Sequence, residues 1–168
     1  MLIIPAIDLQ GGSVVRFVQG HKEKKVYSDD PVKVAKFWVK QGAKFLHIVD
    51  LDGAFTGIPS NLRIVKDIVR AIKIPVEFGG GVRSISTINS ILKSGVDRVV
   101  LGTKAVEDKK FLKDAFARFG DRIIVGVDAK EGKIMVKGWK SGYKNTDAIK
   151  FSLYLKEIGF KELIYTDT

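Results

Sequence analysis

The chain has 168 residues, of which 45% are hydrophobic, and its 29 Lys and Arg against 19 Asp and Glu give a formal net charge of +10. That length suits one domain with its own core, and the lack of a long apolar segment or a cleavable leader argues against membrane insertion and secretion. With no Cys and two His, the composition argues against disulfides and against zinc or His-rich metal sites, so we expect a cytoplasmic protein.

The positive charge is spread along the whole chain. Its densest run, "HKEKK" at 21–25, contains a Glu, and no basic stripe alternates with aromatic residues as in nucleic-acid-binding proteins. Solvated lysines on helix faces explain such a distribution, and attraction for a phosphorylated small molecule is the other interpretation. We therefore expect no nucleic-acid partner.

Short β-branched segments alternate with helical patterns along the chain. The expected strands are "LIIPAID" (2–8), "FLHIVD" (45–50), "PVEFGGG" (75–81), "RVVLG" (98–102), "RIIVGVD" (122–128) and "LIYT" (163–166). The expected helices begin at Pro31 after the cap Asp30, after the cap Ser60, after Ser84, near Phe111 and at Thr146.

This order of six strands and five helices predicts an α/β fold with a parallel sheet. The strands are continuous apolar runs, which is typical of strands buried on both faces. Three helix-to-strand joints, "QGAKF", "SGVDR" and "IGFKE", carry a Gly where a left-handed helix cap favours this residue.

The sequence contains an internal repeat. "IIPAIDLQGGSVVRFVQG" from Ile3 aligns with "IIVGVDAKEGKIMVKGW" from Ile123, and "KQGAKFLHIVDL" aligns with "KEIGFKELIYTDT" after a small shift. Such a repeat predicts a TIM (βα)8 barrel, incomplete here, in a single domain 1–168. Residues 1–120 would form the first half-barrel and 121–168 the start of the second. An open doubly wound sheet is the alternative, but no G-x-G-x-x-G motif follows the first strand.

Carboxylates at the carboxyl ends of the expected strands are candidates for function, because parallel barrels carry their active sites there. Asp8, Asp50, Asp52 and Asp128 predict a mouth lined with acidic groups. Asp8 and Asp128, related by the repeat, would face each other across a closed barrel, where one takes a proton and the other gives one. Alternatively, either carboxylate makes structural hydrogen bonds to the loop that follows it.

Two glycine-containing segments on neighbouring strands predict a phosphate site. "GGGVR" (79–83) precedes a helix start, and "LGTKAVED" (101–108) follows the next strand. Glycines let the backbone approach an anion closely, and a helix N-terminus offers unpaired N–H groups. The alternative is that these glycines only form tight turns.

Two further side chains have two interpretations each. His47 lies inside an apolar run, where a core histidine with satisfied hydrogen bonds is as plausible as a functional one. Trp139, in "KGWKSG", is either a lid aromatic that stacks on a planar substrate or a local packing residue.

The motifs "PAIDLQGGSVVRFVQG", "HIVDLDGA", "EFGGGVR", "GTKAVED", "GVDAKEGKIMVKGW" and "YTD" occur in an order and spacing typical of one family. Over its whole length the chain resembles the phosphoribosylformimino-aminoimidazole carboxamide ribotide (ProFAR) isomerases of histidine biosynthesis. A sister barrel, the cyclase subunit of imidazole glycerol phosphate synthase, is the alternative, although "VDLDGA" and "KGW" favour the isomerase.

The resemblance implies an Amadori rearrangement of a bisphosphorylated aminoaldose into an aminoketose, without metal or organic cofactor. By position, Asp8 corresponds to the general base that removes the proton from sugar C2. Asp128 corresponds to a proton donor, a role that the family also places on an acid in the loop after the sixth strand. Contacts to substrate or phosphate are implied for Gly80, Gly81, Arg83, Gly102, Thr103, Trp139 and Thr166.

The barrel plan also raises an expectation about the 168-residue chain itself. Since strands seven and eight of the plan are lacking, we expect open sheet edges, impaired or absent isomerase activity and self-association, whereas a full-length barrel is expected to be a monomer. The alternative is a non-catalytic partial barrel that oligomerises or binds a phosphosugar.

Overall fold

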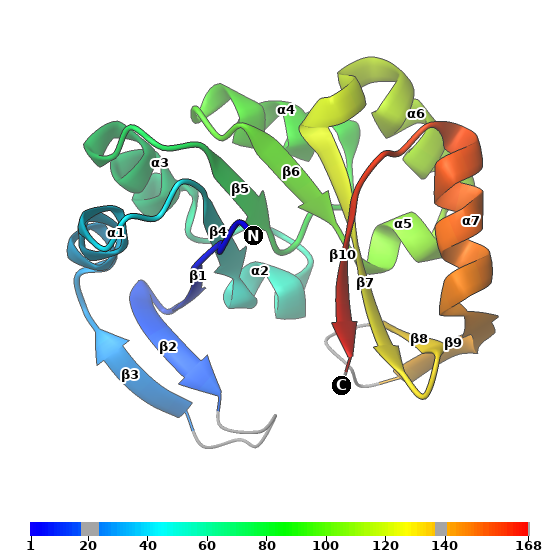
Figure 1. Cartoon of the computed structure of the whole chain (residues 1–168), viewed down its shortest axis with the longest axis horizontal. Helices are drawn as coiled ribbons and strands as arrows, with labels where there is room; N and C mark the ends of the chain where they lie inside the picture. The colour runs from blue at the N-terminus through cyan, green and yellow to red at the C-terminus, as the bar shows by residue number, and fades with distance from the viewer. Residues whose placement is uncertain (18–23, 137–140, 168) are drawn as a thin grey trace.

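The computed structural model describes residues 1–17, 24–136 and 141–167 and shows an α/β fold built on one curved sheet (Figure 1). Parallel pairing joins β1 (Ala6–Gln10), β4 (Leu46–Asp50), β5 (Val76–Gly79), β6 (Arg98–Leu101), β7 (Ile123–Lys130) and β10 (Leu163–Asp167), in that order. These strands lie where the sequence predicts strands. The predicted total is nevertheless wrong, because antiparallel hairpins raise the described strands of the sheet to ten.

The additional strands extend the sheet at both ends of the parallel part. They are β2 (Ser13–Phe17), β3 (Lys24–Ser28), β8 (Lys133–Val136) and β9 (Ser141–Asp147). The hairpins β1–β2 and β7–β8 share one register, since Leu9 pairs with Val14 and Ala129 pairs with Ile134, each 120 positions farther on. The internal repeat of the sequence therefore has a direct structural counterpart.

Five long helices occupy the predicted segments: α1 (Pro31–Lys40), α3 (Leu62–Ala71), α4 (Ile85–Lys93), α6 (Lys109–Phe119) and α7 (Ala148–Ile158). Asp30 caps α1 as predicted, and its Oδ1 accepts a hydrogen bond from Lys33 N at 2.9 Å. The predicted cap Ser60 is wrong, because the N-cap of α3 is Asn61.

Short helices escaped the prediction. They are α2 (Leu51–Thr56), α5 (Thr103–Glu107) and the 3-10 helix η1 (Gly120–Arg122). Each is too short to show the 3.6-residue apolar period on which a sequence prediction rests.

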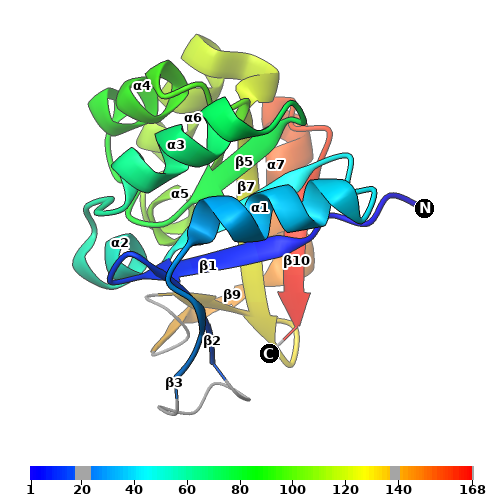
Figure 2. The ribbon, with the colours of Figure 1, turned by 90° about the vertical axis from the view of Figure 1, so that its left-hand side faces the viewer.

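The long helices cover one face of the sheet. They lie along its outer side, and Figure 2 looks onto α1 and α3 in front of β1 and β5. Strand residues on this side, such as Ile7, Ile48 and Phe78, are completely buried. On the inner, concave face several strand residues are half-buried, including Asp8 and Asp128. The prediction that the strands are buried on both faces therefore fails at these positions, although Val100 and Ile124 on the same face are buried.

The sheet is open. Among the described residues no pairing joins β1 to β10. The carboxyl ends of the parallel strands gather in the lower part of Figure 1, together with α2 and the hairpins β2–β3 and β8–β9. Parallel α/β folds bind their ligands at this end. None of the described helices has the length and apolar character needed to cross a membrane.

Candidate functional site

Asp8 and Asp128 occupy matching places on the concave face, each third from the carboxyl end of its strand and half-buried. They are not neighbours. Strand pairing leads from Asp8 on β1 through Val49, Gly79 and Val100 to Ile124 on β7. Ile124 lies four residues before Asp128. A (βα)8 barrel has a shear of about eight, roughly one residue per strand, so four strand steps bring Asp128 to the height of Asp8. The two carboxylates thus share one level of the concave face.

The environment of Asp8 shifts its protonation. Burial raises the pKa of the Asp8 carboxyl above its ordinary value, and the positive field of His47 offsets part of this rise. His47 lies on the adjacent strand, where it pairs with Ala6 while Val49 pairs with Asp8. His47 and Asp8 are therefore diagonal neighbours on the concave face. A carboxylate with a raised pKa is a stronger base than an exposed one, which suits proton abstraction.

Thr166 lies directly beside Asp128. β10 pairs in parallel with β7, and the register places these two residues opposite each other. Both are half-buried, and residues paired in this way point to the same face of a sheet. The structure therefore brings together a carboxylate and a hydroxyl that the sequence predicts separately.

Gly80 and Gly81 follow β5 and pack against the backbone of the α2 segment. Both have positive φ, 115° and 72°. A Cβ at Gly80 would lie 2.9 Å from the carbonyl carbon of Asp50, and one at Gly81 would lie 2.7 Å from the carbonyl oxygen of Gly53. These approaches of backbone to backbone require glycine without any ligand, so the tight-turn alternative accounts for both positions. A phosphate contact by their amides is compatible with this packing but is not needed to explain it.

Gly102 has different surroundings. It is exposed, and a Cβ added there would meet nothing within 4 Å. It precedes Thr103 at the start of α5, whose N-cap makes no side-chain hydrogen bond. Because β5 and β6 are neighbours in the sheet, this segment lies next to 79–81 at the carboxyl edge. Of the two glycine segments, the one at Gly102 has open room for an anion.

Arg83 lies at the same end of the fold. Its side chain is exposed, and a Cβ at Gly57, the left-handed C-cap of α2, would come within 2.5 Å of Arg83 Cζ. The guanidinium is therefore seated on the end of α2. Trp139, the remaining predicted contact, lies outside the described residues.

Asp50 does not line the mouth, contrary to the prediction. Its side chain is completely buried, since the alternation along β4 turns it toward the helices. It accepts four hydrogen bonds, from Gly53 N (2.9 Å), Ser60 N (2.7 Å), Asn61 N (2.8 Å) and Asn61 Nδ2 (2.8 Å). Asp52 Oδ2 accepts from Gly11 N at 2.7 Å and ties α2 to the β1–β2 turn. Both carboxylates hold loops together.

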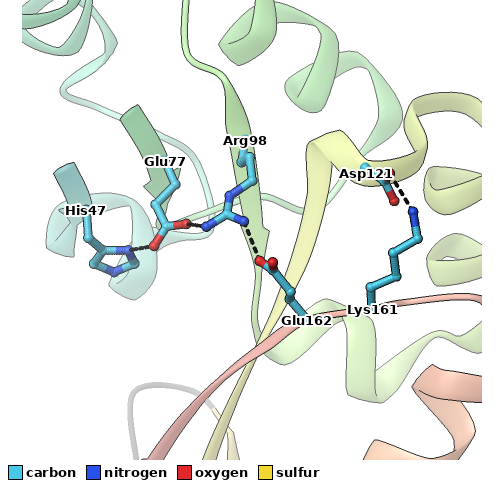
Figure 3. Close-up of polar contacts among 6 residues, drawn as sticks. All are labelled: His47, Glu77, Arg98, Asp121, Lys161 and Glu162. Atoms are coloured by element: carbon cyan, nitrogen blue, oxygen red, sulfur yellow. Dashed lines mark hydrogen bonds and ion pairs between the residues drawn. The ribbon is translucent and has the colours of Figure 1, made fainter. Parts of the chain in front are cut away.

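A chain of polar contacts crosses the concave face toward the amino ends of the strands (Figure 3). His47 Nδ1 lies 2.8 Å from Glu77 Oε1, and Arg98 donates to Glu77 Oε2 at 2.7 Å. Arg98 also donates to Glu162 Oε2 at 2.6 Å. Burial acts to raise the pKa of Glu77, but the hydrogen bonds and charges of His47 and Arg98 outweigh it and lower that pKa. Sequence reasoning missed this chain, and its one signal was a charged residue inside the apolar run "PVEFGG".

The carboxylates are not arranged for metal binding. Within the described residues no group of three or more His, Cys, Asp or Glu side chains could hold a metal ion. Asp8 and Asp128 lie on separate strands, and the oxygens of Asp50 are occupied by backbone and amide donors. The arrangement instead favours proton transfer by single carboxylates.

Comparison with known proteins identifies the family. Residues 2–168 match the histidine biosynthesis protein family. The chain belongs to this family. It is 49% identical over 168 residues to the 1-(5-phosphoribosyl)-5-((5-phosphoribosylamino)methylideneamino)imidazole-4-carboxamide isomerase of Alkaliphilus metalliredigens (strain QYMF), covering 99% of this chain and 70% of the relative.

Isomerases of the same name show similar agreement in other organisms. The one from Desulforudis audaxviator (strain MP104C) is 48% identical over 99% of this chain and 64% of its own length. The one from Persephonella marina (strain DSM 14350 / EX-H1) is 46% identical over 98% of this chain and 68% of its own length. The chain therefore spans about two thirds of the length of these relatives.

These matches confirm the resemblance found in the sequence motifs. The family has the TIM-barrel architecture, and the mostly parallel α/β sheet is consistent with it. The named relatives are isomerases, so the chain comes from a family of enzymes.

Proposed function

We propose that this chain carries out aldose–ketose isomerisation on the bisphosphorylated substrate named for its relatives, 1-(5-phosphoribosyl)-5-((5-phosphoribosylamino)methylideneamino)imidazole-4-carboxamide. The proposal rests on family membership together with one observation. Asp8, half-buried and with a raised pKa, stands at the carboxyl end of β1 on the concave face. Asp128 shares its level on β7, with Thr166 beside it.

The reaction needs a base and an acid but no external oxidant, because C2 of the sugar loses a hydrogen while C1 gains one. An acid first protonates the ring oxygen, and the lone pair of the nitrogen on C1 opens the ring to a protonated imine at C1. The positive charge of this imine makes the C2–H bond acidic, and Asp8 takes that proton to leave an enaminol. Proton delivery to C1 and loss of the C2 hydroxyl proton then give the ketone. Asp128 is the proposed proton donor, with the hydroxyl of Thr166 as its neighbour.

We assign one phosphate of the substrate to the edge formed by segments 79–81 and 102–103. Gly102 leaves open space, and Thr103 begins the short helix α5, whose N-terminal N–H groups are suitable donors to an anion bound there. Arg83, seated on the end of α2, supplies a positive charge nearby. The net charge of +10 favours the approach of a doubly phosphorylated ligand.

The experiment is turnover of this substrate by the purified chain in D2O, followed by NMR of the ribose. We expect loss of the C2 proton signal and appearance of the ketose, and we expect Asp8→Asn to lower kcat by about 10²- to 10⁴-fold. Asp121→Asn is the control, because Asp121 forms an exposed ion pair with Lys161. An Asp8→Asn variant as active as the unaltered chain would refute the role of Asp8, and no conversion by the unaltered chain would refute the function.

A further inference from the structure

The polar chain of His47, Glu77, Arg98 and Glu162 has no part in the mechanism above, although it ends beside Asp8. Its members come from β4, β5, β6 and the segment before β10, so it links most of the parallel sheet (Figure 3). The exposed fraction of the side chain is 3% at Glu77, 20% at His47, 23% at Arg98 and 64% at Glu162. These polar contacts therefore extend from the exposed Glu162 to the buried Glu77 on the concave face.

Stability alone gives no reason for a carboxylate at Glu77. A buried ion pair loses several kcal/mol per ion in hydration, and replacing it with apolar residues is often neutral or stabilising. Buried apolar side chains do occur on the same face of neighbouring strands, for example Val100 and Ile124, which lie level with Gly79. We therefore attribute the presence of a carboxylate at Glu77 to the side chains that it binds.

Arg98 fixes the charge of Glu77. Its guanidinium stays protonated at all ordinary pH, bonds to Glu77 and Glu162, and lies 4.7 Å above the ring of Phe45. With Arg98 on one oxygen of Glu77, the other oxygen is directed at His47 Nδ1. The imidazole is thus held through one nitrogen by a side chain that is itself held on both sides.

We propose that His47 is a positioning residue for Asp8: Glu77 and Arg98 hold its imidazole ring on the concave face, where it is the diagonal neighbour of Asp8 on the adjacent strand and sets the basicity of that carboxylate. This inference rests on the proposed function only in that Asp8 is the base. The electrostatic influence of His47 on Asp8 acts against burial, so the two effects together set how strong a base Asp8 is.

The other charged groups on elements that contact β1 do not replace His47. Val15 of β2 lies opposite Asp8, so the adjacent Arg16 points to the other face. Asp52 of α2 is negative and is bound to Gly11 N. Helix α1 packs on the outer face, and its charged residues are Lys33, Lys36 and Lys40.

A carboxyl ¹³C titration of Asp8, assigned by comparison with Asp8→Asn, tests the inference without turnover. We expect His47→Gln to raise the titration midpoint of Asp8 and His47→Lys, which places a positive charge at the same position, to bring it back. Asp121→Asn, which breaks the exposed ion pair in Figure 3, should leave it unchanged. Amide spectra establish that each variant folds, and His47→Asn serves as the neutral variant if His47→Gln does not.

Two results would overturn the inference: a folded neutral variant with an unmoved Asp8 midpoint, or a His47→Lys variant that shifts like His47→Gln. In the isomerase assay, the acid limb of kcat/KM should move to higher pH in His47→Gln, with a smaller change on the plateau. Below the midpoint the ionised fraction of Asp8 falls about tenfold per pH unit, so the rate loss should follow the same slope. An inactive unaltered chain would refute the proposed function and leave the titration to decide on His47.

Discussion

Substitution of Gly80 by Ala tests whether the glycines after β5 serve packing. In the structure Gly80 has a φ of 115°, and an added Cβ would lie 2.9 Å from the carbonyl carbon of Asp50 and from its Cβ. Both neighbouring atoms belong to a residue that is completely buried and held by four hydrogen bonds. The neighbour therefore has little freedom to give way.

Two costs add up in this variant. A β-carbon at positive φ costs about 1–2 kcal/mol, and forcing a packed backbone to move costs about 1–3 kcal/mol. We expect the free energy of unfolding to fall by about 2–5 kcal/mol, which is a large part of the roughly 5–15 kcal/mol available to a domain. With a urea slope of about 1–3 kcal/mol/M, the midpoint should fall by about 2 M.

Urea unfolding followed by circular dichroism measures this change without any ligand. Gly42→Ala is the matched control, because Gly42 has a φ of 91° but a Cβ there would meet nothing within 4 Å. This variant should show only the conformational cost of about 1–2 kcal/mol. Equal losses in the two variants would show that the contact with Asp50 contributes nothing and would refute the packing explanation.

Three carboxylates give further predictions. Burial raises the pKa of Asp8, so ionisation of this carboxyl opposes folding above that pKa. The Asp8→Asn variant should therefore be more stable than the unaltered chain at pH 7 and equally stable below the ordinary Asp pKa of about 3.9. Equal urea midpoints of the two proteins at pH 7 would contradict this. In the Asp50→Asn variant an amide N–H faces the N–H groups of Ser60 and Asn61, so the free energy of unfolding, measured by thermal unfolding, should fall by about 3 kcal/mol. A fall of less than about 1 kcal/mol would be inconsistent with these hydrogen bonds. The pKa of Glu77 is lowered in the folded state, so the ionised carboxylate stabilises the fold above the ordinary Glu pKa of about 4.3. This stabilisation is lost as the pH falls through the pKa of Glu77 in the folded protein. The Glu77→Gln variant should lack this pH dependence in acid unfolding, whereas the control Asp121→Asn should keep it.

The sequence predicted the features that depend on local pattern. The parallel strands, the five long helices and the cap Asp30 follow from apolar periods and capping residues. The hairpins themselves were not predicted, but the repeat explains why they share one register, because equal spacing of Asp, turn and apolar residues gives equal pairing. The level of Asp8 and Asp128 follows from the same equivalence.

Features that depend on distant partners could not be predicted. Glu77 is recognisable as unusual in its strand, but its partners His47 and Arg98 are 30 and 21 residues away, and no local rule pairs them. The sequence also does not show whether Gly80 faces a ligand or another backbone, since both need the same residue. Asp50 was misassigned because a strand-end carboxylate looks the same whether it points into the mouth or toward the helices.

The contacts of α2 make a mechanical connection between loops that are far apart in sequence. Gly80 packs against Asp50, and Arg83 packs against Gly57. Asp52 accepts a hydrogen bond from Gly11. These contacts join the turns after β1, β4 and β5 into one connected structure. A ligand that immobilises any one of these turns therefore reduces the motion of all three. Amide exchange at Gly11 would consequently report on an anion bound near Gly81, even though the two residues lie in turns that follow different strands.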